Sequence, residues 1–324
     1  MAVKENVLLA LERSRGQCLS GSQLAEQLGV TRAAVHKAVD GLRAEGLQIA
    51  AKPGEGYCLA LDDDSLTIAA VQSHLTTQTI GRTLLIEPCL SSTNTVMKEK
   101  YLNQPDGFTL MAEQQTGGRG RLGRSFSSPS GTGIYLTILL HPTVSISKIQ
   151  FLTIAAAVAV AKAISETAGF SPQIKWVNDV LMNGRKLCGI LTEATIEGES
   201  GAVHSLIVGI GVNLRPNPYW SEEVRAVAGA LSEFGTVPRR AVLAAAVLSH
   251  FEKAYRLLVE GQERQLLADY QTQLCCLNQT ITVISPTETY EAFCTGLDEN
   301  GYLLIRRKDG SIQTLSSGEI SIRL

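Results

Sequence analysis

Residues 4–46 repeat apolar and polar positions with the period of an α-helix. A first apolar stripe covers residues 4–15, and the run GSQLAEQLGVTRAAVHKAVDGLRAEG at 21–46 carries two further helical patterns that break at Gly29. Glycine suits a left-handed turn between two packed helices, because it has no Cβ to clash. The pattern predicts a helix-turn-helix, with the small Ala25 where the two helices cross.

The last of these predicted helices has one apolar and one polar face. Thr31 is suited to cap its start. Val35, Ala38 and Leu42 form the inward stripe. The stretch LQIAAKPGEGYCLA that follows has two short β-prone runs around a Pro-Gly-x-Gly turn, which is the order of a winged helix. We expect DNA contacts from the exposed residues Thr31, Arg32, Ala33, His36 and Lys37. A small helical bundle that contacts only protein is the alternative.

Strand and helix patterns mix from residue 66 onwards. Strands are expected at 82–90, 107–114, 131–142, 172–198 and 202–215, and helices at 147–168, 221–234 and 239–273. Short β-prone runs with turns at DENG, KDGS and SSGE predict a small β-barrel at the C-terminal end. The acidic LDDDS at 61–65 is typical of a linker. We therefore expect three domains, at residues 1–62, 66–273 and 277–324.

The composition is that of an ordinary globular protein. Hydrophobic residues make up 44% of the chain and charged residues 19%, and the net charge is −2. The whole-chain charge gives no indication of nucleic-acid binding, so that any such role must be local. The most apolar run, FLTIAAAVAVAKAI, is shorter than a bilayer span and contains Lys162, which favours a core helix over a membrane helix.

The cysteines and the N-terminal residues indicate a reducing compartment. Seven cysteines are scattered without a C-x-x-C spacing, which predicts neither a disulfide framework nor a zinc site. The N-terminal MAVKENVLLALERSRGQ mixes acidic and basic residues with its leucines, unlike a secretory signal. We expect a cytosolic protein.

The stretch EQQTGGRGRLGRS at 113–125 sets Arg119, Arg121 and Arg124 among four glycines. The surrounding segment 114–165 holds no aspartate or glutamate, so these arginines form a local positive field. Arginine forks match carboxylates and phosphates, and glycines allow the backbone to close over them. Neither a Walker A loop nor a dinucleotide-binding fingerprint is present. Single-stranded RNA is an alternative ligand, but the 5% aromatic content gives little support for base stacking.

Three further groups carry candidate chemistry. Ser92, Thr93 and Asn94 stand at a predicted helix start, where they either cap the helix or hold a neutral polar group. Lys175, in IKWVND, is either a surface lysine or the partner of an anion. The strand GIGVN ends at Asn213, and its glycines allow close approach of a ligand.

In this order the four motifs resemble the biotin–protein ligase family. The succession is S-T-N, then Q-x-x-G-R-G-R-x-G-R, then K-W-x-N-D, then G-I-G-x-N. With the predicted winged helix, the chain is similar to the bifunctional bacterial form, which is a biotin ligase and a repressor of the biotin operon. Leu122 departs from the arginine of some members, and Val177 departs from the common proline of K-W-P-N-D.

The resemblance implies an α+β fold of three parts. These are an N-terminal winged helix-turn-helix, a central mixed α/β catalytic domain with a mainly antiparallel sheet like that of class II synthetases, and a C-terminal SH3-like β-barrel. It also implies ATP-dependent formation of biotinyl-5′-AMP, with Mg²⁺ accompanying ATP and no dedicated metal site. The biotin is then transferred to a lysine of the carrier domain of acetyl-CoA carboxylase.

The resemblance assigns roles to individual residues. Biotin contacts are expected from Ser92, Thr93, Asn94, Gln115, Arg119, Gly120, Arg121 and Lys175, and nucleotide contacts from Gly118, Arg124 and Asn213. Lys175, Arg121 and Arg119 are the expected catalytic residues, because they hold charge where the carboxylate and phosphate join. Lys186 is an equally open choice between a second site charge and a solvated lysine.

The implied partners are operator DNA and a second copy of the chain. Biotinyl-5′-AMP acts as corepressor in this scheme, and a cytoplasmic homodimer on a palindromic operator is expected. Two alternatives stay open: a lipoate or octanoate ligase of the same fold, and a ligand-sensing transcription regulator without catalysis.

Overall fold

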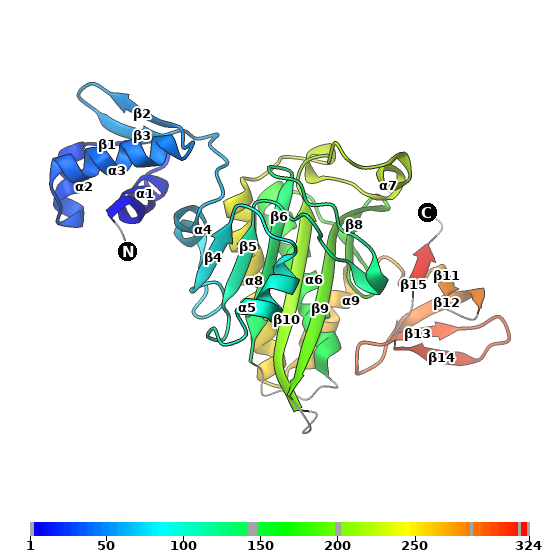
Figure 1. The fold of residues 1–324 in the computed structure, drawn as a ribbon. Coiled ribbons are helices and arrows are strands. Elements are labelled where there is room, and N and C mark those ends of the chain that lie inside the picture. The colour runs from blue at the N-terminus through cyan, green and yellow to red at the C-terminus, as the bar shows by residue number, and fades with distance from the viewer. Residues whose placement is uncertain (1–2, 142–147, 198–201, 286–287, 317–318, 323–324) are drawn as a thin grey trace. The chain divides into compact units, whose positions relative to one another are not determined.

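The structure is a computed structural model that describes residues 3–141, 148–197, 202–285, 288–316 and 319–322. The chain forms two compact units (Figure 1). Unit 1 comprises Met1–Thr76 with Pro238–Ala246, and unit 2 comprises Thr77–Val237 with Val247–Leu324. The expected domain limits at 62, 66, 273 and 277 stay predictions.

Unit 1 contains a winged helix-turn-helix. Its elements are α1 (Val3–Arg13), β1 (Cys18–Leu19), α2 (Gly21–Leu28), α3 (Arg32–Ala44), β2 (Ile49–Lys52), β3 (Gly56–Leu59) and α4 (Ile68–His74). The strands form an antiparallel sheet in the order β1-β3-β2, in which β2 and β3 are the predicted hairpin. One apolar core joins the first three helices to this sheet.

The turn between α2 and α3 has the geometry that its residues predict. Gly29 lies at φ 64°, in the left-handed region, and ends α2. The Thr31 Oγ1 accepts a hydrogen bond from the Ala34 amide at 3.2 Å and so caps α3. Val35, Ala38 and Leu42 are buried, which confirms the predicted inward stripe.

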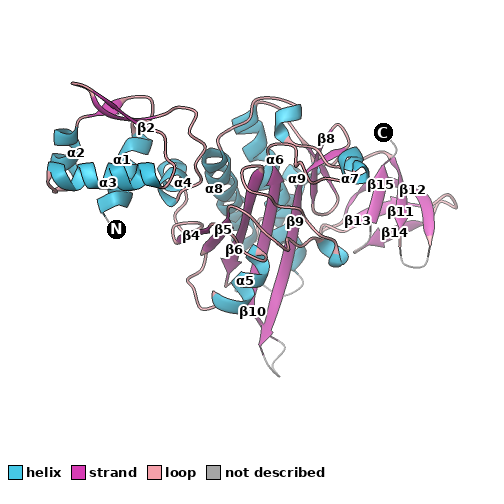
Figure 2. Cartoon of the chain, turned by 45° about the horizontal axis from the view of Figure 1, so that its top comes forward, coloured by secondary structure: helices cyan, strands magenta, loops and turns pink. Residues whose placement is uncertain are grey.

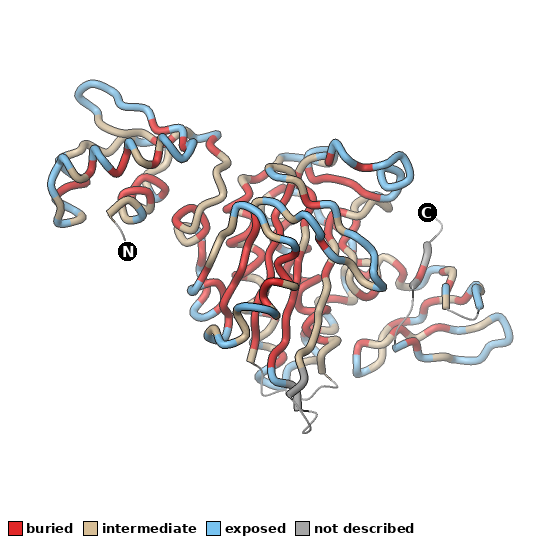
Figure 3. The backbone as a smooth tube through the Cα atoms, in the orientation of Figure 1, coloured by how far each residue is buried: buried red, intermediate tan, exposed pale blue. Residues whose placement is uncertain are grey.

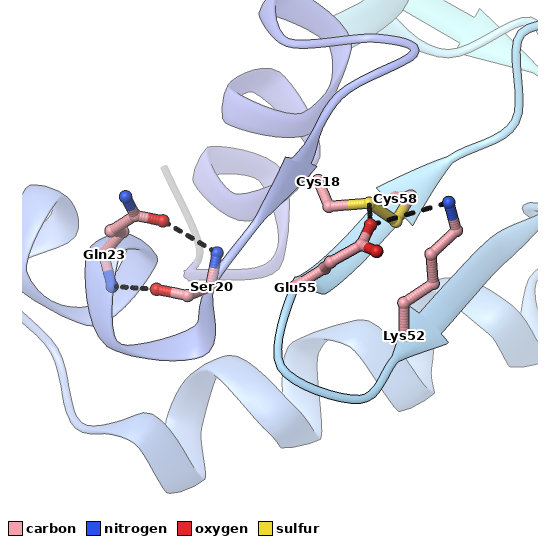
Figure 4. The surroundings of a disulfide bond; sticks show 6 residues. All are labelled: Cys18, Ser20, Gln23, Lys52, Glu55 and Cys58. Atoms are coloured by element: carbon pink, nitrogen blue, oxygen red, sulfur yellow. Dashed lines mark hydrogen bonds and ion pairs between the residues drawn. A yellow bond between two sulfur atoms is a disulfide. The ribbon is translucent and has the colours of Figure 1, made fainter.

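A disulfide in unit 1 corrects the expectation drawn from the cysteine spacing. Cys18 and Cys58 are 40 residues apart, but the antiparallel register of β1 and β3 pairs them directly and brings their Cα atoms to 4.2 Å (Figure 4). Spacing rules search for nearby cysteines and do not see a pair that a sheet creates. Glu55 lies beside the sulfurs, with its Oε2 3.3 Å from the Cys18 Sγ.

Unit 2 is built on a seven-stranded sheet. Its strands are β4 (Leu84–Glu87), β5 (Thr109–Ala112), β6 (Gly133–Leu140), β7 (Gln173–Lys175), β8 (Asp179–Met182), β9 (Arg185–Glu197) and β10 (Ala202–Asn213). They lie in the order β4-β5-β6-β10-β9-β8-β7, and the β4–β5 pair is parallel while the other neighbours pair antiparallel. The mainly antiparallel sheet is confirmed. Buried strands β6 and β10 form its centre (Figure 3).

Helices cover both faces of this sheet (Figure 2). Helix α5 (Thr93–Lys100) contacts β6 and β10 on one face, and α6 (Ile149–Ala168) contacts β9 and β10 on the other. By length and composition α6 is apolar enough to cross a bilayer, yet the fold buries most of it, as predicted for a core helix. Helix α9 (Glu263–Gln271) packs on α6 and follows α8 (Arg240–Val259).

Two of the predicted helices are broken. The segment 221–234 forms α7 (Glu222–Val227) and a 3₁₀ turn at Leu231–Glu233. The segment 239–273 divides into α8 and α9 because Gly261 adopts φ 71° between them.

The C-terminal strands form a five-stranded antiparallel sheet. They are β11 (Thr280–Ile284), β12 (Thr289–Leu297), β13 (Leu303–Arg306), β14 (Ile312–Leu315) and β15 (Glu319–Ile322), in the order β14-β13-β12-β11-β15. The Gly301 carbonyl accepts hydrogen bonds from the Trp176 Nε1 at 3.1 Å and the Gln150 Nε2 at 2.7 Å. The turn before β13 is thereby joined to helix α6 through Gln150 and to the segment that carries Lys175 through Trp176.

Candidate active site

A pocket of about 480 Å³ opens over the centre of the seven-stranded sheet. We call it the inner pocket. Its lining comes from the start of α5, from the segment after β5, from β6, from the β7–β8 turn, and from β9 and β10: Ser92, Thr93, Asn94, Gln115, Arg119, Gly120, Arg121, Phe126, Leu136, Asn178, Lys186, Gly189, Ile190, Leu191, Gly209, Ile210 and Gly211. Its mixed polar and apolar lining suits a small organic molecule with one polar end.

One side of the inner pocket is a set of buried polar residues, which we call the polar set: Ser92, Thr93, Asn94 and Gln115. Ser92 occupies the cap position of α5, but its side chain makes no capping hydrogen bond. Instead, the Gln115 Oε1 accepts from the Thr93 amide at 2.8 Å and the Thr93 Oγ1 at 3.2 Å. The Gln115 Nε2 donates to the Ser128 Oγ at 2.9 Å. The Gln115 amide is therefore fixed from both ends.

The Asn94 side chain is fixed in the same way. Its Oδ1 accepts from the Thr137 Oγ1 at 2.7 Å, and its Nδ2 donates to the Leu191 carbonyl at 3.1 Å and the Glu193 Oε2 at 2.9 Å. Gly209 leaves the room for it, since a Cβ there would lie 2.2 Å from the Asn94 Oδ1. The glycine of GIGVN thus permits a close approach by a protein side chain.

The arginine loop, residues 117–128, also borders the inner pocket. Short backbone bonds shape it: the Gly120 amide donates to the Arg124 carbonyl at 2.7 Å, and the Phe126 amide donates to the Gly118 carbonyl at 2.8 Å. Leu122 sits at its tip, 79% exposed and at φ 54°, which is unusual for a residue with a Cβ.

Two loop arginines are held by side chains of the sheet. The Arg121 Nη1 donates to the Asn178 Oδ1 at 3.0 Å. The Arg119 Nη1 lies 3.6 Å from the Glu193 Oε1, and the Arg119 side chain is 49% exposed. Exposed ion pairs of this length contribute little energy, so that an incoming anion can replace the protein carboxylate.

A second pocket of about 700 Å³ adjoins the first, and we call it the outer pocket. The two share Gly120, Arg121, Phe126, Asn178 and Lys186, and the outer pocket adds Arg124, Lys175 and Asp179 among others. The Lys186 Nζ lies 2.7 Å from the Asp179 Oδ1. The outer pocket therefore has more cationic than acidic groups and suits an anion such as a phosphate chain.

Glu193 carries negative charge beside the polar set. Burial by itself raises the pKa of this carboxyl, but hydrogen bonds from Lys98 and Asn94 and the charges of Lys98 and Arg119 outweigh it, so the pKa lies below the usual value. The carboxylate is ionised at neutral pH.

Most of the residues expected to bind ligands lie together. Seven of the eight expected biotin contacts line the inner pocket, and the eighth, Lys175, lines the outer pocket with Arg124. Gly118 and Asn213 line neither pocket. A Cβ on Gly118 would lie 2.3 Å from the Phe126 carbonyl, and the Asn213 Nδ2 donates to the Gly229 carbonyl at 3.2 Å. Both positions have local structural reasons for their residue type.

Three lining or adjacent residues were not expected from the sequence. Asn178 belongs to the quoted IKWVND motif, in which only the lysine was singled out. Phe126 packs against the backbone of Gly189 and Gly211, where a Cβ would come within 3.6 and 2.7 Å of its ring. Glu193 follows Leu191 at strand spacing, and this alternation is the signal that placed both toward the pocket.

The five expected DNA-contact residues are all exposed on α3. Arg32, Ala33 and His36 line an open groove with Lys52 and Pro53 of the β2–β3 hairpin. The groove therefore has α3 on one side and the β2–β3 hairpin on the other.

Comparisons with known proteins agree with this arrangement. Three family models match: Biotin/lipoate A/B protein ligase family at residues 86–213, HTH domain at 3–58 and Biotin protein ligase C terminal domain at 276–323. The chain is similar to Bifunctional ligase/repressor BirA of Bacillus subtilis (strain 168), with 31% identity that covers 99% of this chain and 98% of that protein. The protein of the same name from Escherichia coli (strain K12) is 28% identical, over 96% of this chain and 94% of that protein.

A solved structure shares the fold of unit 2. Biotin protein ligase from Aquifex aeolicus, in complex with biotin and ATP, matches with a TM-score of 0.65 and 28% identity. The match covers 75% of this chain and 99% of that chain.

Proposed function

The chain belongs to the biotin protein ligase family, in its bifunctional ligase and repressor form, and we propose that the inner and outer pockets adenylate biotin. The observation that carries the proposal is that the inner and outer pockets adjoin and share lining residues. A fixed polar set meets the arginine loop in the inner pocket, which opens onto cationic groups in the outer pocket. Such a pair of pockets fits a neutral head group with a carboxylate tail, next to a nucleoside triphosphate.

The reaction has two steps. A biotin carboxylate oxygen attacks the α-phosphorus of ATP, the bond from that phosphorus to the bridging oxygen breaks, and pyrophosphate leaves. The amine of an acceptor lysine then attacks the biotinyl carbonyl, and AMP leaves. The protein forms no covalent bond in either step, so that positioning and charge stabilisation carry the catalysis.

The polar set binds the ureido end of biotin in this proposal. Ser92, Thr93, Asn94 and Gln115 are buried or half-buried, and the side-chain amides of Asn94 and Gln115 are already oriented by protein hydrogen bonds. A preoriented set loses little freedom when the ligand arrives.

The arginine loop and Lys175 bind the anionic part. Arg119, Gly120 and Arg121 close over the biotin carboxylate and the α-phosphate, and Arg124 and Lys175 contact the phosphates from the outer pocket. The closed loop shields the mixed anhydride from water. Gly118 supports the loop from within, and Asn213 supports the segment 217–231 beside the nucleotide, because its amide holds the Gly229 carbonyl.

Magnesium enters with ATP in this proposal. The outer pocket offers the Asp179 carboxylate, which already faces Lys186, so the side chains fit a metal that is bound mainly by phosphate oxygens and water. Mg²⁺ supplies neutralisation of phosphate charge, while Asp179 holds Lys186 at the junction of the two pockets.

The test is biotin-dependent exchange of pyrophosphate into ATP, with lipoate and octanoate as parallel substrates. Exchange with biotin alone is expected. Exchange with lipoate or octanoate would support the related ligases of the same fold, and no exchange with any acid would leave a ligand-binding regulator.

Residues 1–62 serve as the DNA-binding domain in the proposal, residues 66–273 as the ligase and residues 277–324 as an SH3-like C-terminal domain. In the proposal two copies of the chain form a homodimer that biotinyl-5′-AMP stabilises. The dimer binds a palindromic operator through the exposed residues Thr31, Arg32, Ala33, His36 and Lys37. An electrophoretic shift that tightens when biotin and ATP are added is expected, and a shift that both leave unchanged would contradict this coupling.

The acceptor in this proposal is a lysine on the biotin carrier domain of acetyl-CoA carboxylase, and the compartment is the cytoplasm. Transfer of labelled biotin to a purified carrier domain, but not to a carrier whose acceptor lysine is replaced by arginine, is the expected result.

A further inference from the structure

Glu193 does not line the inner pocket itself, but it contacts two residues that do, Asn94 and Arg119. It lies on β9, with 19% of its side chain exposed. Its two oxygens divide their partners: Oε2 accepts from the Asn94 Nδ2 at 2.9 Å, while Oε1 accepts from the Lys98 Nζ at 2.8 Å and lies 3.6 Å from the Arg119 Nη1. One carboxylate thus joins a residue of the polar set to a residue of the arginine loop.

We propose that Glu193 is a positioning residue for biotin, which fixes the Asn94 amide and holds Arg119 at the mouth of the inner pocket until the substrate carboxylate takes its place. The inference rests on the proposed function and deepens it. Lys98 pairs with the same carboxylate oxygen at 2.8 Å, while the longer contact to the half-exposed Arg119 is weak enough for a substrate carboxylate to replace it.

The orientation of Asn94 depends on this carboxylate. An asparagine amide can turn over and exchange its oxygen and nitrogen, and its neighbours decide which face it shows. At Asn94, Thr137 donates to the oxygen while Glu193 and the Leu191 carbonyl accept from the nitrogen. Asn94 and Lys98 donate to different oxygens of Glu193, and a glutamine replaces one of these oxygens with an NH₂ group that only donates, so one of the two contacts is lost.

The decisive comparison is between Glu193→Gln and Lys98→Met. Both remove the ion pair between β9 and α5, but Lys98→Met leaves the carboxylate on Asn94 and Arg119 intact, and Lys98 lines neither pocket. We expect Glu193→Gln to raise the KM for biotin about tenfold and to lower kcat less than about threefold, because one misoriented hydrogen bond is lost. Lys98→Met should leave the KM within about twofold of the wild type.

A purely structural ion pair would give a different pattern. Both variants would then lower the melting temperature alike and leave the KM for biotin unchanged, which would overturn the proposal. Glu263→Gln is the matched control, because Glu263 pairs with Lys148 on another part of unit 2. Where Glu193→Gln does not fold, Glu193→Asp serves instead: it keeps the charge near Lys98 but shortens the reach to Asn94, and the same KM split is expected.

A double-mutant cycle identifies the route of the effect. In an Asn94→Ala background, Glu193→Gln should change biotin affinity by less than about twofold, because residues that act through each other are not additive. Biotin affinity is measured by calorimetry on the full chain, independently of exchange. If the wild type binds biotin but does not exchange pyrophosphate into ATP, the adenylation proposal is wrong, and the comparison of biotin affinities still tests the role of Glu193. Equal affinities in wild type and Glu193→Gln would overturn the positioning role, and no biotin binding by the wild type would overturn both.

Discussion

The polar set and the arginine loop both border the inner pocket, but the side chains of the polar set are mostly buried while those of the loop are mostly exposed. Ser92, Thr93 and Asn94 are nearly fully buried at the start of α5, and the hydrogen-bond partners of the Asn94 side chain lie on strands β6 and β9. The arginine loop has its side chains largely in solvent, with Arg119 49% and Leu122 79% exposed. The comparison teaches that recognition of a neutral group is built in advance, while charge is brought in by a segment that is free to exchange partners.

The largest effect should come from removing the charge that only the closed loop supplies. Arg121→Ala should lower the rate of adenylate formation by about 10²–10³-fold, as for other lost oxyanion contacts, and should let adenylate leak. Single-turnover quench-flow with labelled ATP measures both. Arg264→Ala, on the exposed side of α9, is the control, and normal adenylate yield and retention in Arg121→Ala would remove the loop from the mechanism.

The next largest effect tests how rigid the polar set is. Gly209→Ala places a Cβ 2.2 Å from the Asn94 Oδ1, in a sheet that cannot move away. We expect kcat/KM for biotin to fall about a hundredfold and the free energy of unfolding to fall by about 1–3 kcal/mol, as in other overpacked sites. Gly41→Ala, inside helix α3 and with its nearest atom 3.5 Å away on a flexible lysine, should leave the biotin kinetics unchanged and should not lower the free energy of unfolding. Unchanged biotin kinetics in Gly209→Ala would show that the polar set adapts.

A milder change removes one hydrogen bond from the same set. Thr137→Val deletes the donor to the Asn94 Oδ1, and we expect the KM for biotin to rise about tenfold, from the cost of one unsatisfied buried acceptor. Thr153→Val is the matched control: it also breaks a buried hydroxyl contact, to Thr192, but Thr153 does not line the pocket. Both variants should lose similar stability, and a KM effect in Thr153→Val would point to the sheet rather than to Asn94.

The sequence predicts the two regions to different depths. Motif order identifies Ser92, Thr93, Asn94 and the loop arginines, because their residue types suit the expected ligand. It does not identify Glu193, since a lone acid in a strand is normally a solvated residue, and only the register of β9 against β10 brings it behind Asn94. For the same reason, Cys18 and Cys58 become neighbours only when β1 pairs with β3.

The elements of the fold also differ in how well the sequence predicts them. Helix α6 and the turn at Gly29 are predictable, because long apolar periodicity and a single glycine act locally. The break between α8 and α9 is local as well, because Gly261 adopts φ 71°, yet the predicted helix runs through it, and α7 ends at Val227, short of the predicted limit at residue 234. Asn213 illustrates the limit: its residue type fits a nucleotide contact, but its amide is used by the Gly229 carbonyl.

A smaller effect concerns the strained tip of the arginine loop. Leu122 adopts φ 54°, a region that costs a residue with a Cβ about 1–2 kcal/mol but that asparagine tolerates. Leu122→Asn should stabilise the present turn and slow trypsin cleavage at the loop arginines by about threefold, while Leu122→Val should speed it. Mass spectrometry of early cleavage products measures this, and equal rates in both variants would mean that the turn is not populated.

The smallest expected effect is the pH response of the polar set. The pKa of Glu193 lies below its ordinary value, because hydrogen bonds from Lys98 and Asn94 and nearby cations outweigh its burial. A depressed pKa means that its contribution is complete above the unfolded value of about 4.3 and is lost only as pH falls through the lower folded value. Biotinamide, which has no titrating carboxylate, should therefore bind within about twofold between about pH 5.5 and 8. Because biotinamide has no carboxylate, the loop arginines form no ion pair with it, and the pH dependence of its affinity reports on the polar set. A clear loss of affinity as pH falls within this window would mean that Glu193 titrates there and that the set is less fixed than its hydrogen bonds indicate.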